Sequence, residues 1–222
     1  MATVLLTGFE PYGNTPHNPA ESVARLLDGS LCAGADVTAR IVPSRFFECI
    51  DSVTESIEEL SPTVVMMMGE FPGRATLTVE RIAQNLIDAT RYGLADNVGS
   101  APQDEMTAPD GPAAYYATVP LRAMVTAVRE AGIPADISDA PGTLMCNHLM
   151  YGVLHYVATR NLSTRVGWIH LPQLPEVAAL EENLGTASMS AQTAAQGVEV
   201  ALAAAIAHVE DVSTPVSSRF QI

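Results

Sequence analysis

The stretch Thr63-Val64-Val65-Met66-Met67-Met68-Gly69 is an uninterrupted apolar run that has the length of a strand and ends at a glycine. Continuous apolar runs of this length are typical of strands that are buried on both faces, as in a parallel sheet covered by helices. We therefore expect residues 63–69 to form a central strand of such a sheet.

Strand and helix patterns alternate on both sides of this run. We predict further strands at residues 3–7, 36–42, 76–83, 135–138 and 166–171, and helices at residues 18–27, 44–60, 121–131, 146–160 and 188–210. The alternation predicts an α/β fold with a mainly parallel sheet that helices cover on both faces. No repeat or linker divides the chain, so we expect a single domain over residues 1–222, with a mobile tail after about residue 212.

Composition limits the partners and the compartment. The chain of 222 residues has 11 Lys and Arg against 25 Asp and Glu, a formal net charge of -14, which repels nucleic acids and anionic lipid surfaces. Three cysteines do not form a disulfide framework, so we expect free thiols and a cytoplasmic location. Residues 1–10 have no basic leader and only a short apolar run, so we expect neither a signal peptide nor a membrane span.

Cys146 is the main candidate for chemistry, because it follows the Pro141-Gly142 turn and begins a helical pattern. Unpaired N–H groups and the dipole at a helix N-terminus favour the thiolate, which is the nucleophilic form of cysteine. A small buried apolar side chain is the alternative interpretation. A zinc site with Cys146 and His148 as ligands is a second alternative, but no other pair has the spacing of zinc ligands.

A cysteine nucleophile needs a base and a group that orients the base. His170 is the best-placed base, because it ends a predicted strand, whereas the other histidines lie in a loop or within helices (His17, His148, His155 and His208). Glu80 is the first choice for the orienting acid, because it lies in an otherwise apolar strand pattern. Asp139 and Glu176 are alternatives, and a solvent-exposed position is the other interpretation of Glu80.

Several of these residues follow predicted strands, and ligands of α/β sheets bind at the carboxyl ends of parallel strands. We therefore expect four segments to meet at one crevice: Gly8-Phe9, Gly69-Glu70, the turn 139–146 and His170. The crevice would also include Phe9 and Tyr12 as an apolar wall, unless these rings only pack the core. Residues 88–112 have no apolar period and are predicted to form a lid or part of the site. These features indicate a cysteine hydrolase of unknown substrate.

Ordered motifs extend along nearly the whole chain. They are Thr7-Gly8-Phe9-Glu10-Pro11-Tyr12-Gly13 with Asn18-Pro19-Ala20, Glu80-Arg81 with Asn85 and Asp88, Asp96-Asn97, residues 110–116, residues 132–135, Gly142-Thr143 with Cys146-Asn147-His148 and Met150-Tyr151-Gly152, and Ile169-His170 with Pro172, Pro175 and Glu176. Together they resemble the pyroglutamyl peptidase I (pyrrolidone carboxyl peptidase) family.

The resemblance implies a cysteine peptidase that removes N-terminal pyroglutamate from peptides, with Cys146, His170 and Glu80 as its catalytic triad. It also implies a single three-layer α/β/α sandwich, assembly into homotetramers or dimers, and no metal or organic cofactor. The substrate-binding residues that it implies are Phe9, Tyr12, Gly69, Glu70, Leu144 and Met145.

Departures from the family pattern leave two other functions open. The family has Gly-Gln-Ala-Gly-Gly-Arg where residues 69–74 are Gly-Glu-Phe-Pro-Gly-Arg, and Asn-Thr-Ala-Gly-Thr-Phe-Val where residues 139–145 are Asp-Ala-Pro-Gly-Thr-Leu-Met. Because Glu70 and Pro72 change the pocket turn, the alternatives are a small-amide binding protein that retains the fold and a hydrolase with shifted acyl specificity. The segment after residue 88 is longer than usual, which leaves the role of Arg91 open.

Overall fold

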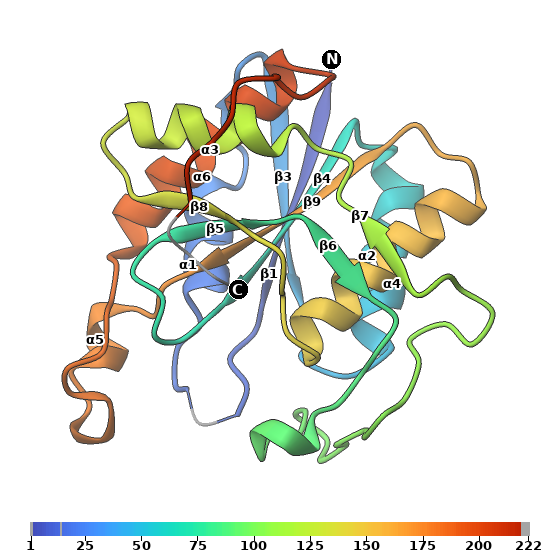
Figure 1. The fold of residues 1–222 in the computed structure, drawn as a ribbon, viewed down its shortest axis with the longest axis vertical. Helices are drawn as coiled ribbons and strands as arrows, with labels where there is room; N and C mark the ends of the chain where they lie inside the picture. The colour runs from blue at the N-terminus through green and yellow to red at the C-terminus, as the bar shows by residue number, and fades with distance from the viewer. Residues whose placement is uncertain (1, 14, 219–222) are drawn as a thin grey trace.

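A computed structural model describes residues 2–13 and 15–218, and within them the strands form one seven-stranded sheet and one two-stranded sheet (Figure 1). The large sheet has the strand order β2-β3-β1-β4-β9-β5-β8, and β6 pairs with β7. The strands are β1 (Thr3–Phe9), β2 (Leu31–Cys32), β3 (Ala35–Val42), β4 (Val64–Glu70), β5 (Leu77–Glu80), β6 (Ile82–Gln84), β7 (Ala114–Tyr116), β8 (Ala135–Ser138) and β9 (Arg165–Leu171).

The helices are α1 (Pro19–Leu27), α2 (Glu48–Leu60), α3 (Leu121–Glu130), α4 (Met145–Thr159), α5 (Pro175–Ala178) and α6 (Ala191–Ala207), with short 3-10 turns η1 (Thr90–Tyr92) and η2 (Glu181–Asn183). No helix in the described ranges is long and apolar enough to cross a membrane.

The sheet is mainly parallel, as predicted, with antiparallel pairs towards its two edges, and β4 lies at its centre. Strands β3, β1, β4 and β9 run parallel to one another, whereas β5 and β8 run antiparallel to β9. Strand β2 is antiparallel to β3 at the other edge. The expected α/β class is therefore confirmed.

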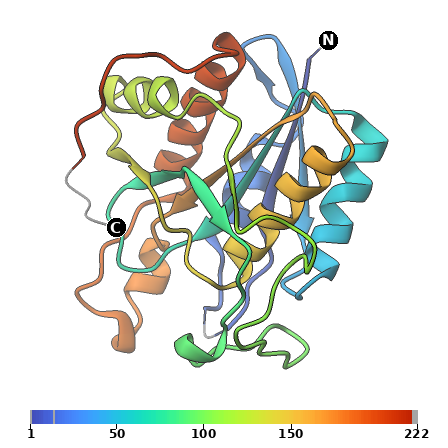
Figure 2. The ribbon, with the colours of Figure 1, turned by 45° about the vertical axis from the view of Figure 1, so that its right-hand side comes forward.

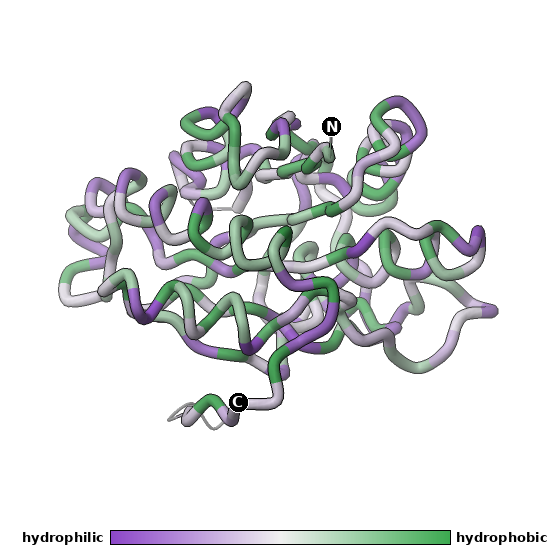
Figure 3. Tube along the Cα trace, turned by 90° about the horizontal axis from the view of Figure 1, so that it is seen from above, coloured by the Kyte–Doolittle hydropathy of each residue, from purple (hydrophilic) through white to green (hydrophobic). Residues whose placement is uncertain are grey.

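Helices cover both faces of the large sheet, as Figure 2 shows. Along β1, Val4 and Leu6 pack with α1, α3 and α6, while Leu5 packs with α2 and α4 on the opposite face. Both faces of the strand are buried because successive side chains point in opposite directions, and each fully buried Leu stabilises the fold by about 1.5–3 kcal/mol. Hydrophobic and hydrophilic residues alternate along the helices in Figure 3, as expected of helices with one face on the sheet.

The starts of two helices show where local sequence signals predicted the first helical residue correctly and where they did not. Helix α1 begins as predicted, because the Asn18 side chain accepts a hydrogen bond from the Ala20 N–H. Helix α2 begins at Glu48, so the prediction of a start at Ser44 is wrong. The Ser44 N–H and hydroxyl instead donate to Glu10, and Phe47 has a φ of 63°, which is outside the right-handed helical region.

Two other segments differ from their predicted bounds by three residues or more. The strand predicted at residues 76–83 divides at Arg81 into β5 and β6, which belong to different sheets. The last helix spans Ala191–Ala207, which is shorter than the predicted 188–210, and Ser190 caps it.

The C-terminal tail makes contacts with the body of the protein. Arg129 donates to the Ser217 carbonyl, and the Ser218 hydroxyl donates to Asp136. The mobility of the tail after residue 212 stays a prediction, and its part at residues 219–222 lies outside the described residues.

His148 connects three separate parts of the chain. Its fully buried ring accepts a hydrogen bond from the Phe47 N–H at Nε2 (2.9 Å), and its Nδ1 is 2.9 Å from the Thr107 hydroxyl. These contacts join α4 to the beginning of α2 and to the 88–112 segment. Since Nε2 is an acceptor, His148 must be neutral, and burial lowers its pKa from 6.5 to about 3.

We predict that His148 makes the fold sensitive to acid. Unfolded His148 takes up a proton as the pH falls below 6.5, whereas the folded protein resists protonation until about pH 3, so the stabilisation is complete above pH 6.5 and is lost towards pH 3. Urea unfolding should show that His148→Gln reduces the loss of unfolding free energy between about pH 7 and pH 5 by about 2 kcal/mol. The exposed His17→Gln is the control, and equal slopes for wild type and His148→Gln would contradict the assignment.

Candidate active site

A pocket of about 430 Å³ opens beside the carboxyl ends of β4 and β9. Cys146 and His170 line it, together with residues that include Tyr12, Glu70, Tyr92, Pro141, Leu144 and Gln173. The expected meeting of the loop after β1, the end of β4, the turn before α4 and His170 is therefore observed. The turn 139–146 was expected here because it follows a predicted parallel strand, and this reason is wrong. Strand β8 runs antiparallel to β9, so its carboxyl end lies at the side of the sheet opposite to the carboxyl ends of β4 and β9.

Cys146 lies in the first turn of α4, where its thiol is almost completely buried, with 4 % of the residue exposed. Burial raises the pKa of the Cys146 thiol to about 12, and the charge of Glu80 adds to this effect, while a hydrogen bond from Tyr12 opposes it. A helix dipole contributes about 0.3–1 kcal/mol, whereas this shift from 9.0 corresponds to about 4 kcal/mol. The predicted preference for the thiolate is therefore wrong for the resting protein, and the thiol form dominates.

His170 and Glu80 are in direct contact inside the sheet. Nδ1 of His170 lies 2.7 Å from Oε1 of Glu80, and the two residues are 1 % and 0 % exposed. Burial raises the pKa of Glu80, but His170 and then Arg74 lower it by a larger amount. The net pKa is therefore below its usual value. Burial lowers the pKa of His170 despite the opposing effect of Glu80. The pair is thus a carboxylate and a neutral imidazole.

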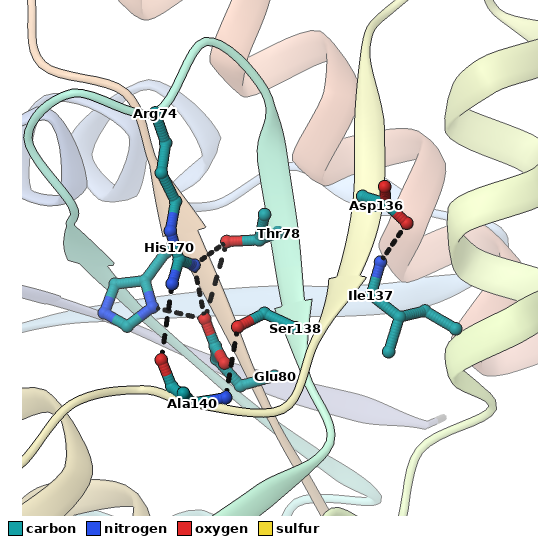
Figure 4. A network of polar contacts seen from close by, with 8 residues as sticks. All are labelled: Arg74, Thr78, Glu80, Asp136, Ile137, Ser138, Ala140 and His170. Carbon is teal, nitrogen blue, oxygen red and sulfur yellow. Dashed lines mark hydrogen bonds and ion pairs between the residues drawn. The ribbon is translucent and has the colours of Figure 1, made fainter. Parts of the chain in front are cut away.

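Arg74 is a site residue that the sequence analysis missed. Its Nη1 donates to Oε1 of Glu80 at 2.7 Å and to the Thr78 hydroxyl, and its Nη2 donates to the Ala140 carbonyl (Figure 4). The available signal was the match of Arg74 to the final arginine of the segment Gly-Gln-Ala-Gly-Gly-Arg, which residues 69–74 resemble.

Gly69 allows Cys146 to lie directly against β4. A Cβ atom at Gly69 would be 2.7 Å from the Cys146 Sγ and 2.8 Å from the Trp168 ring, both closer than real Cβ atoms approach other heavy atoms. Any other residue at this position would have to displace the thiol or the indole.

The other predicted substrate-binding residues divide into two groups. Tyr12, Glu70 and Leu144 line the pocket. Phe9 and Met145 are each 1 % exposed and lie behind its wall. The Phe9 ring packs against Tyr12, with centroids 6.3 Å apart, and Met145 Sδ is 3.8 Å from Cys49 Sγ.

Glu70 adds an acidic group to the pocket wall. Burial raises its pKa to about 7. The ion pairs found in the described part of the chain do not include Glu70. Its carboxyl group is therefore able to interact with a ligand and to change its charge near neutral pH.

The rival candidates for base and acid are engaged elsewhere or exposed. His17, His208 and Glu176 are exposed, His155 bonds to the Tyr115 hydroxyl, and Asp139 pairs with Arg81 at 2.8 Å. No group of three or more His, Cys, Asp or Glu residues in the described ranges has the arrangement of a metal site.

The 88–112 segment contributes Tyr92 and Leu94 to the pocket wall, in agreement with its predicted role. Arg91 is exposed and lies 5.3 Å from the Tyr92 ring centroid, so it contacts the residue that lines the pocket rather than the pocket itself.

Comparisons with known proteins place the chain in one family. The model of the pyroglutamyl peptidase family matches residues 2–208. A pyrrolidone-carboxylate peptidase of Mycobacterium marinum is 57 % identical over the full length of both chains, and one of Cupriavidus taiwanensis is 43 % identical over 96 % of both.

Solved structures agree as well. Pyroglutamyl peptidase I of Bacillus amyloliquefaciens matches with a TM-score of 0.91 and 32 % identity, over 97 % of this chain and 100 % of that one. Pyrrolidone carboxyl peptidase of Thermococcus litoralis has a TM-score of 0.92 and 34 % identity at the same coverage. The chain therefore belongs to the pyroglutamyl peptidase family of cysteine hydrolases.

Proposed function

We propose that this protein hydrolyses the amide bond after an N-terminal pyroglutamyl residue of peptides, with Cys146, His170 and Glu80 as its catalytic triad. The observation that carries the proposal is the orientation of His170. Its Nδ1 is held by Glu80, while its Nε2, buried and without a hydrogen-bond partner among the described residues, belongs to the same pocket as the Cys146 thiol.

The geometry supports a mechanism of acyl transfer. Nε2 of His170 takes the thiol proton as Cys146 attacks the carbonyl carbon of the pyroglutamyl group, and it then gives this proton to the leaving amine. Nε2 then takes a proton from water as the water oxygen attacks the thioester, and it returns this proton to the Cys146 sulfur as the free acid is released. Glu80 orients the imidazole and stabilises the imidazolium, and the N–H groups in the first turn of α4 stabilise the oxyanion.

The pocket suits a small neutral acyl group. Tyr12, Pro141 and Leu144 supply apolar surface, and pyroglutamate carries no charged amine that would need an ionic partner. Gln173 and Val177 also line the pocket, and we expect the peptide that follows to extend past them.

The assembly and setting of the protein are further parts of the proposal. One sheet and its two helical layers extend from β1 to α6, which supports a single catalytic domain over residues 1–222. Family resemblance supports a homotetramer or dimer that needs no cofactor. Three free cysteines support a cytoplasmic location, and the net charge of -14 disfavours nucleic acid and membrane partners.

Glu70 favours one competing function, a hydrolase with shifted acyl specificity. A carboxylate in the pocket would bind the protonated ring amine of an N-terminal prolyl group, which has the size of the lactam but carries a charge. Faster hydrolysis of prolyl amides than of pyroglutamyl amides would replace the leading proposal, whereas binding of 5-oxoproline without turnover would indicate a binding protein.

We predict that Cys146→Ser lowers kcat/KM for a chromogenic pyroglutamyl amide at least about 1,000-fold, because the alcohol is a much weaker nucleophile in this site. Cys32→Ser is the matched control, since Cys32 lies in β2 and its thiol only donates to the Glu199 carbonyl. Thiol alkylation should inactivate the wild type and Cys32→Ser equally. Persisting activity in Cys146→Ser would refute the assignment of the nucleophile.

We predict that Glu70 limits activity above neutral pH. Below a pKa of about 7 the Glu70 carboxyl is neutral, and above it the carboxylate disfavours negative charge on Cys146. The neutral variant Glu70→Gln should therefore have wild-type kcat/KM at about pH 6 and a several-fold higher value at about pH 8.5. The exposed Glu176→Gln is the control, and a ratio that does not change with pH would show that Glu70 does not act through its charge.

A further inference from the structure

Three donors share one oxygen atom of Glu80, and the most distant of them is the Thr78 hydroxyl at 3.5 Å. Nδ1 of His170 and Nη1 of Arg74 both lie 2.7 Å from Oε1. Figure 4 shows the guanidinium group and the imidazole ring directed at this carboxylate from different segments. The carboxylate charge is therefore divided between a permanent cation and the proposed catalytic base.

The three groups are enclosed by protein. Arg74, Glu80 and His170 have exposures of 4 %, 0 % and 1 %. Arg74 is held in place by the Thr78 hydroxyl and the Ala140 carbonyl, and its guanidinium carbon lies 3.6 Å from the centre of the Phe71 ring. The edge of Phe71 in turn contacts His170, with centroids 5.2 Å apart.

We propose that Arg74 is a positioning residue that neutralises the charge of Glu80, so that His170 rests as a neutral imidazole and Cys146 as a thiol, rather than as an imidazolium–thiolate pair. This inference rests on the proposed function, because it concerns the same triad.

Charge balance inside the site supports this assignment. With Arg74 present, the ionised Glu80 is already paired, so a neutral His170 and a neutral thiol leave the buried cluster without net charge. Without Arg74 the same cluster would carry one uncompensated negative charge, which is costly in a buried site. The Glu80–His170 pair would then take up a proton from solvent, and this proton would occupy Nε2, the atom that must accept the thiol proton.

The surrounding titratable groups do not supply a substitute for Arg74. Three titratable side chains face the site: Cys146 on α4, Glu70 at the end of β4 and Tyr12 in the loop after β1. Each of them is neutral when protonated and negative when deprotonated, so none supplies a positive charge. The pKa of His170 is lowered by burial and by the charge of Arg74, in the direction that the geometry requires.

The protonation state of His170 can be measured without substrate. The full-length protein is labelled with ¹⁵N-histidine, and His170→Gln identifies the His170 signals among those of five histidines. In the wild type, we expect a neutral His170 with its proton on Nδ1 near pH 7. An imidazolium at this pH would overturn the proposal, even if no Arg74 variant folds.

The variants separate charge from structure. Arg74→Gln should raise the pH at which His170 takes up a proton by about one to three units, because an opposite-sign neighbour of the carboxylate is lost. The acid limb of kcat/KM should move upward by the same amount. Arg74→Lys should restore both, and Arg122→Gln, which removes an arginine charge that pairs with Asp211 outside the pocket, should leave both unshifted.

A merely structural Arg74 would lower activity in Arg74→Gln equally at all pH values, with an unchanged His170 titration, and this result would overturn the proposal. Failure of this inference and failure of the proposed function can be told apart. A protein that does not hydrolyse pyroglutamyl amides would still show, or fail to show, the shift of the His170 titration in Arg74→Gln.

Discussion

The buried carboxylate of Glu80 is the constraint on which the site depends. An ionised group with no exposed surface is destabilising by several kcal/mol unless charged or hydrogen-bonding partners surround it. Arg74 and His170 are these partners, and both contact the same oxygen. These contacts therefore orient the His170 ring and the turn that carries Arg74.

The reversed direction of β5 makes this arrangement possible. In the antiparallel pair of β5 and β9, Thr78 lies opposite His170, and Glu80 is on the same face as Thr78 two residues later. Both side chains therefore reach the guanidinium group of Arg74. The short connection at residues 71–76 already required an antiparallel orientation of β4 and β5, because parallel strands need a crossover of a dozen or more residues.

Sequence patterns predicted the parts of the fold that depend on local chemistry. The apolar run at residues 63–69 identified β4, the capping group of Asn18 identified the start of α1, and the end of a predicted strand placed His170 at the pocket that Cys146 also lines. Contacts between distant segments decided the rest. His148 holds Phe47 in a non-helical conformation, so α2 begins later than predicted. Gly69 and Trp168 enclose Cys146 so closely that burial affects the pKa of the thiol more than the helix dipole does. Neither effect has a local signature, and the inward direction of Phe9 and Met145 has none either.

A neutral resting site suits a neutral substrate under the proposed mechanism. Entry of a lactam beside a thiol and an uncharged imidazole brings no further ion out of water, so the ring amide needs hydrogen-bond partners but no ionic partner. Charge then develops only as the thiol proton moves to His170 and negative charge appears on the carbonyl oxygen. The carboxylate of Glu80 and the N–H groups of α4 are already oriented for that moment. Their interaction free energy therefore stabilises the transition state more than the ground state, which is the condition for faster chemistry rather than tighter binding.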